Sequence, residues 1–284
     1  MITTAERPSR SGSVTIDASY LSLTCGAIGA LVYGLGCLAV WITPEGTRLA
    51  WGLQVVGPLL VAVGLSTQLE HMARRIGSWA VRLGIIGLFV WAVSGVPFLI
   101  SPESYASPGW NQVLYLAWSA AYLLFALALF LVLGRKESRL EQRGATGDAG
   151  IHASFSSLTL GAVGWMLFGL GFLAYAEDLV GTRFAWGMQA AGPILLALAL
   201  ATHLDHLARR LGVAAVTVAI VGAGVWSLTT VAFVFDPPLA QSATWGPLCF
   251  WGVYGAGIVL GGVSGVLVIA RKARATRGRQ QPPR

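Results

Sequence analysis

Ten polar side chains are the residues of this chain that could bind a ligand or carry chemistry. They are Gln54, Gln68, Glu70, His71, Arg75, Gln189, His203, Asp205, His206 and Arg210. A histidine beside an arginine suits the binding of an anionic group or the relay of a proton, because imidazole changes its charge near neutral pH. A glutamine inside an apolar segment suits a polar pathway or a hydrogen bond between helices.

These residues form two groups related by a constant shift along the chain, which places Ser22 on Ser157. In the range 22–121, 42 of 100 positions are identical to their counterparts in 157–256. Agreement is densest in 46–77 against 181–212, with 19 identities in 32 positions. His71 matches His206 and Arg75 matches Arg210, whereas Gln68 is replaced by His203. Internal similarity of this kind predicts a duplicated fold, and polar residues kept in both copies are the best candidates for a site.

The elements that must position these residues are membrane-spanning helices. The chain is 55% hydrophobic and 11% charged, which leaves too little polar surface for a water-soluble domain. Its charge-free stretches each have roughly the 17–25 residues of a membrane-crossing helix. They are 19–42, 49–69, 83–102, 110–134, 154–176, 184–202, 211–235 and 244–270. We therefore predict an all-α integral membrane protein with eight transmembrane helices.

Basic residues predict the orientation of these helices. With both termini in the cytoplasm, 17 of the 19 Lys and Arg residues lie inside, and only Arg48 and Arg183 lie outside. Four spans per copy then make the two repeats parallel, related by a pseudo-twofold axis along the membrane normal. The formal charge of +7 reflects this orientation and does not indicate nucleic-acid binding.

The same pattern predicts the boundaries of the segments. They are a disordered cytoplasmic N-terminus (1–18), a first four-helix repeat (19–134), a cytoplasmic linker (135–153), a second repeat (154–270) and a basic cytoplasmic tail (271–284). We expect disorder from Lys272 onwards, and a solvated His152 within the linker.

The second helix of each copy is predicted to carry the site. We expect this helix to be continuous, so that Gln54, Gln68 and Arg75 share one stripe at about 100° per residue, with His71 at its edge. Glu70 lies on the opposite side. Equivalent residues that face the pseudo-twofold axis would meet, so we expect His71 and His206 to converge, with Gln68 and His203 beside them.

Other interpretations of these residues stay open. Paired arginines at a cytoplasmic helix end are typical of simple membrane anchoring, and the glutamines are typical of contacts between helices. Two histidines that face each other across a bundle could instead ligate a haem iron, which would make the chain a haem- or quinone-handling redox subunit. We expect no resident metal or cofactor outside this alternative.

What the sequence lacks argues against several functions. No Asp, Glu, Lys or Arg lies in the middle of a span, and this disfavours an ion-coupled pump. Motifs of nucleophilic, zinc and phosphate chemistry are missing. Cys25, Cys37 and Cys249 correspond to hydrocarbon residues in the other copy, so neither a disulfide framework nor a shared metal site is expected.

The leading hypothesis is a non-enzymatic permease, or a protein that binds a small molecule or a lipid between its repeats. The high Arg, Ala and Gly content suggests a bacterial plasma membrane. A third interpretation is an assembly or scaffold subunit, because Gly257, Gly261 and Gly265 recur every four residues and make a smooth face. That face would pack inside the protein or contact a membrane partner.

Overall fold

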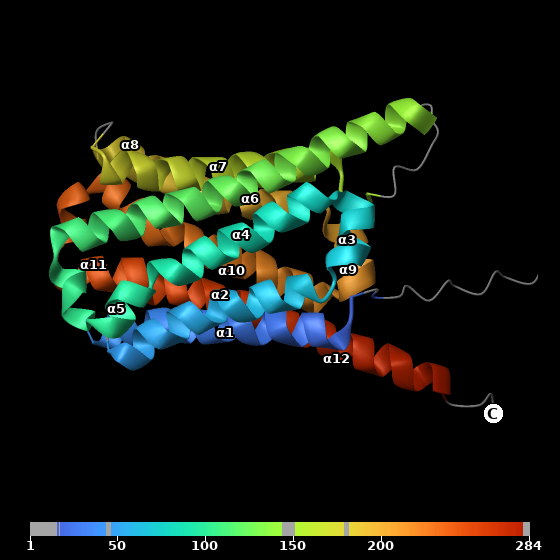
Figure 1. Cartoon of the computed structure of the whole chain (residues 1–284), viewed down its shortest axis with the longest axis horizontal. Helices are drawn as coiled ribbons and strands as arrows, with labels where there is room; N and C mark the ends of the chain where they lie inside the picture. The colour runs from blue at the N-terminus through green and yellow to red at the C-terminus, as the bar shows by residue number, and fades with distance from the viewer. Residues whose placement is uncertain (1–15, 17, 44–46, 144–150, 179–181, 281–284) are drawn as a thin grey trace, which may run out of the picture.

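The computed structural model describes residues 16, 18–43, 47–143, 151–178 and 182–280, and this part of the chain is helical without strands (Figure 1). It contains eight helices that are long and apolar enough to cross a membrane, which confirms the predicted number of spans. These helices run roughly side by side in a long bundle (Figure 1).

The bundle consists of long helices and short elements at its two ends. The long helices are α1 (Tyr20–Ile42), α2 (Arg48–Ser66), α4 (Ser78–Ser94), α6 (Pro108–Arg143), α7 (Phe155–Ala176), α8 (Thr182–Ala201), α10 (Val213–Phe235) and α12 (Tyr254–Gln280). One end carries α3 (Leu69–Ile76) and α9 (Leu204–Leu211). The opposite end carries α5 (Val96–Ile100), η1 (Pro102–Ala106), η2 (Pro237–Gln241), α11 (Trp245–Pro247) and the π-helical turn η3 (Leu248–Val253).

Each long helix packs against two neighbours, so that the eight form a closed ring. The order is α1, α2, α4, α6, α7, α8, α10 and α12, and α12 returns to pack against α1. Hydroxyl caps begin several of these helices. Ser19 and Ser154 accept from the backbone N–H groups of Ser22 and Ser157, and they satisfy donors that the first turn of a helix leaves open.

Aromatic side chains fill the ring from its middle to the end opposite α3 and α9. Tyr33, Trp51, Trp118, Tyr122, Phe168, Phe172, Trp226, Trp251 and Tyr254 belong to one buried cluster. The hydroxyls of Tyr122 and Tyr254 are 3.0 Å apart, and the indole N–H of Trp91 donates to the Tyr33 hydroxyl at 3.1 Å. Aromatic packing with paired polar atoms therefore closes this part of the bundle.

The prediction of one continuous second helix in each half is wrong. Helix α2 ends at Ser66, and α3 begins at Leu69 after a break at Thr67 and Gln68. The Thr67 hydroxyl donates to the Gly64 carbonyl at 2.7 Å. Helix α8 and α9 are separated in the same way, and both short helices run across the end of the bundle (Figure 1). Their charged residues are costly to bury in hydrocarbon, which favours a helix that lies across the end.

Two predicted boundaries also differ from the structure. Helix α6 runs to Arg143, beyond the predicted linker start at residue 135, and α12 runs to Gln280, so the expected disorder from Lys272 is wrong for 272–280. Lys, Arg, Glu, Leu and Ala dominate these extensions, and all are good helix formers. Of the segment 1–18 predicted to be disordered, 1–15 and 17 lie outside the described residues, as do 144–150 and 281–284.

Candidate functional site

The short helices α3 and α9 are held at the end of the bundle by arginines of other helices. The Arg74 carbonyl, in the last turn of α3, accepts from Arg139 Nη2 at 2.7 Å. The Arg209 carbonyl, in the last turn of α9, accepts from Arg271 Nη2 at 2.6 Å. These bonds satisfy carbonyls that a helix end leaves without a partner inside the helix.

A glycine with an unusual backbone conformation follows each short helix. Gly77 has φ 102° and ψ 140°, and Gly212 has φ 103° and ψ 140°. Side chains with a Cβ rarely adopt this region, whereas glycine does so readily. These two residues therefore set the angle at which α3 meets α4 and α9 meets α10.

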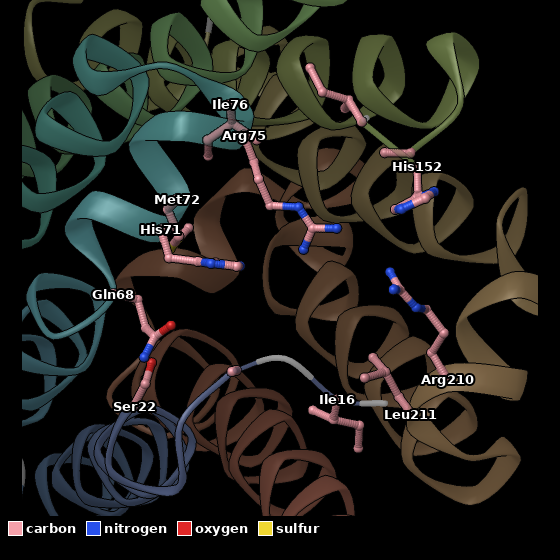
Figure 2. A pocket seen from close by; sticks show the side chains of 13 residues that line it. Ile16, Ser22, Gln68, His71, Met72, Arg75, Ile76, His152, Arg210 and Leu211 are labelled. Atoms are coloured by element: carbon pink, nitrogen blue, oxygen red, sulfur yellow. The ribbon is translucent and has the colours of Figure 1, made fainter. Parts of the chain in front are cut away.

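A pocket of about 380 Å³ lies between α3, α9 and the starts of α1 and α7, and we call it the mouth (Figure 2). Its polar lining consists of Ser22, Gln68, His71, Arg75, His152 and Arg210. The side chains of Arg75 and Arg210 extend into it from opposite sides, and His71 and His152 point into it from its flanks (Figure 2). None of the described lining residues is acidic. The described lining residues are therefore rich in positive charge and in hydrogen-bond donors.

Lysine side chains hold the two chain segments that complete the mouth. Lys136 donates to the Ala153 carbonyl and its ammonium lies 4.8 Å from the ring centre of Phe155. Lys272 donates to the Ala18 carbonyl and lies 4.9 Å from the ring centre of Tyr20. Both carbonyls belong to lining residues, so α6 and α12 fix the walls of the mouth as well as α3 and α9.

Three histidines form a row beside the mouth. The rings of His152 and His206 stack with their centres 5.7 Å apart, and the rings of His203 and His206 are 4.8 Å apart. Burial lowers the pKa of His206, and the neighbouring His203, Arg210, His152 and Arg209 lower it further. This histidine is therefore held in its neutral form above its depressed pKa, and an anion nearby would favour its protonation.

The structure brings together part of the predicted site. Gln68, His71, Arg75 and Arg210 line the mouth, and His206 and His203 reach it through the stack with His152. Glu70 and Asp205 are exposed and are not among the lining residues. The predicted meeting of His71 with His206 is replaced by the stack of His206 on His152.

His152 is the functional candidate that sequence reasoning missed, since it was assigned to a solvated linker. Its side chain is exposed, in agreement with that assignment, and it also lines the mouth. The available signal was its position two residues before Ser154, the cap of α7, on the same side of the bundle as the arginines of α3 and α9.

Gln54 and Gln189 lie away from the mouth. Gln54 is 14 residues before Gln68, which corresponds to about 20 Å along a helix. Both side chains are buried, with 4% and 1% of their surface exposed. Gln54 Nε2 and both polar atoms of Gln189 have no hydrogen-bond partner among the described residues. A hydrogen bond between these two amides, which is one form of the interhelical contact considered above, is therefore not formed.

The predicted glycine face on α12 packs partly within the chain. A Cβ on Gly257 would lie 2.8 Å from the Gly222 carbonyl of α10, and one on Gly265 would lie 2.8 Å from Ala27 of α1. Gly261 has open space beside it. Helix contacts inside the molecule thus account for two of the three glycines, and a contact with a partner subunit stays a prediction.

The described residues contain no group of three or more His, Cys, Asp or Glu side chains placed to hold a metal ion. The stacked rings of His152 and His206 also present faces, rather than nitrogen atoms, to each other. Comparison with models of known families, with curated proteins and with solved structures finds no match. The chemistry of the site therefore has to be argued from its own residues.

Proposed function

We propose that this chain is a non-enzymatic bacterial plasma-membrane protein that binds an anionic group at its mouth. The main support for this proposal is that Arg75 and Arg210 extend into one pocket from opposite sides, with His71 and His152 beside them (Figure 2). Guanidinium groups match the geometry of phosphate and carboxylate oxygens, and charge-assisted hydrogen bonds are among the strongest in proteins. A phosphate or carboxylate, either free or on a lipid headgroup, is the ligand that this lining suits.

In this proposal the molecule is a tandem repeat of two parallel four-helix units, and each unit contributes one arginine. Features at equivalent positions of the two halves support the duplication: the caps Ser19 and Ser154, the backbone of Gly77 and Gly212, and the carbonyls of Arg74 and Arg209 that arginines hold. A shared site at the interface of the repeats is the arrangement that such symmetry favours.

The mouth opens to the cytoplasm in this proposal. Most basic residues gather at the α3/α9 end, in agreement with the positive-inside rule. The aromatic cluster closes the opposite part of the bundle, so a ligand reaches the mouth from the basic end. This supports binding from the cytoplasm or from the inner leaflet, either as a permease that faces inward or as a receptor for the ligand.

Calorimetric titration with inorganic phosphate tests the proposal on the purified protein in zwitterionic nanodiscs. The double variant Arg75→Gln/Arg210→Gln should weaken binding by at least about a hundredfold, since each charge-assisted contact contributes about 1.5–3 kcal/mol. The matched control Arg74→Gln/Arg209→Gln removes the same charge from the neighbouring positions, whose side chains do not line the mouth. Absence of binding by the wild type, or equal weakening by both variants, would refute the proposed site.

A further inference from the structure

A second cavity of about 450 Å³ lies inside the bundle, and we call it the inner cavity. It is lined by residues from six long helices, α1, α6, α7, α8, α10 and α12. Leu158, Leu196, Leu200 and Ile258 are among its walls, and none of the described lining residues is charged. The one hydroxyl among its described lining residues, that of Ser157, already donates a hydrogen bond to the Ala199 carbonyl at 2.8 Å.

The inner cavity lies deeper in the bundle than the mouth, along the same helices. On α1, Ser22 lines the mouth and Ala30 lines the inner cavity, two turns or about 12 Å further on. Ala153 lines the mouth, and Ser157 lines the inner cavity one turn into α7. The two spaces therefore follow one another along the bundle.

Aromatic side chains bound the inner cavity at one end, and an apolar wall connects it with the mouth. Trp165 and Trp226, whose ring centres are 5.6 Å apart, line the cavity and also pack in the aromatic cluster. Leu158 of the inner cavity and Ile151 of the mouth belong to one small apolar cluster on the side of α4, α6 and α7. The lining thus changes from cationic at the mouth to apolar in the inner cavity and aromatic beyond it.

We propose that the ligand of the mouth is a single-chain anionic amphiphile. Its acidic headgroup binds Arg75 and Arg210, and its alkyl chain occupies the inner cavity. This inference rests on the proposed function and narrows its ligand class. An ordered water needs two to four polar partners, and the one buried unpaired side-chain donor among the described lining residues is the indole N–H of Trp226. An alkyl chain instead gains from the removal of its surface from water.

Part of the room for this alkyl chain comes from a glycine found in the second half alone. Gly257 and Gly261 line the inner cavity. Gly87 faces Ala121 and Phe125 of α6. Gly222 faces Gly257 and Gly261 of α12 in the same way, so the π-helical turn η3 has moved the equivalence by one residue. Phe125 packs against the aromatic cluster, and Gly261 therefore makes space where the first half carries an aromatic ring.

The test compares inorganic phosphate, butyl phosphate and decyl phosphate on the wild-type protein in phosphatidylcholine nanodiscs, with protein-free nanodiscs as the partition control. We expect decyl phosphate to bind at least about tenfold more tightly than inorganic phosphate, with butyl phosphate between them. Equal affinities for the three probes would overturn the amphiphile proposal.

A variant that fills the inner cavity tests whether the alkyl chain binds there. Gly261→Leu should weaken the binding of decyl phosphate by about tenfold and leave the affinity for inorganic phosphate unchanged. The variant should fold, since an added Cβ meets no atom within 4 Å there. Gly224→Leu on α10 is the matched control, because it also has open space but does not line the inner cavity. Ala223→Leu fills the same cavity from α10 and serves if Gly261→Leu does not fold. A chain-length gain that both filling variants retain would contradict the assignment.

The outcomes separate the two proposals. Phosphate binding that depends on Arg75 and Arg210 but is insensitive to chain length leaves the anion site and removes the amphiphile. If the affinity for all three probes is unchanged in Arg75→Gln/Arg210→Gln, the anion site is refuted, and the amphiphile proposal is refuted with it.

Discussion

Gly77→Ala tests how the mouth is built. Gly77 holds φ 102° and ψ 140°, a region that costs a residue with a Cβ about 1–3 kcal/mol. The new Cβ would also lie 3.3 Å from Cδ of Arg135, a flexible side chain that can move by a few tenths of an ångström. Backbone strain therefore dominates, and we expect the free energy of unfolding to fall by about 1–3 kcal/mol.

Gly84→Ala is the matched control on the next helix. Gly84 lies inside α4, and an added Cβ meets no atom within 4 Å. There alanine should raise the free energy of unfolding by about 0.5–1 kcal/mol, because it lowers the backbone entropy of the unfolded chain. Gly212→Ala should reproduce the loss seen for Gly77→Ala, since its backbone angles are nearly the same.

Equilibrium unfolding in mixed micelles measures these differences, and phosphate titration of the folded variants measures the site. Arg75 lies two residues before Gly77, so a change in the angle between α3 and α4 displaces its guanidinium and weakens phosphate binding. A Gly77→Ala protein that is as stable as Gly84→Ala and binds phosphate normally would refute the role assigned to this backbone.

Three further predictions concern other residues. Gln189→Met should raise the free energy of unfolding by about 1 kcal/mol, because it removes a buried amide that has no hydrogen-bond partner. Gln54→Met should raise it by less, since only Nε2 of Gln54 is unpaired, and denaturant titration measures both changes. The depressed pKa of His206 predicts that stability without ligand falls as pH drops below about 6.5, and that sulfate binding strengthens over the same range. His206→Gln should reduce both trends relative to the wild type, since His71, Arg75, His152, His203, Arg209 and Arg210 remain around the site. The haem alternative is tested by a visible spectrum of protein from haem-supplied cells, in which we expect no Soret band.

Much of the fold could be predicted from the sequence because its signals are local. Apolar runs of the right length identify each span, and the capping serines Ser19 and Ser154 mark the starts of α1 and α7. The break at Thr67 and Gln68 could not be predicted in this way, since neither residue is a strong helix breaker. It arises where a strongly charged segment would otherwise continue along the bundle axis.

The site was only partly predictable for a similar reason. Matching positions in the two halves identified Arg75 and Arg210, which the structure brings to one pocket. The same comparison grouped Gln54 and Gln189 with them, although these side chains are buried inside the bundle, away from the mouth. His152 has no matching histidine in the first half of the chain, so its place in the mouth depends on the tertiary fold.

Crosslinking across the mouth tests the central claim most directly, namely that two halves of the chain each contribute an arginine to one anion site. In a chain whose three cysteines are replaced by serine, Arg75→Cys/Arg210→Cys should be joined within one molecule by a short bismaleimide, as read by peptide mass spectrometry. The control Arg74→Cys/Arg209→Cys should react with single maleimides without forming the link, since these side chains do not line the mouth. Failure of the 75/210 pair to crosslink, or equal crosslinking of the control pair, would contradict the account.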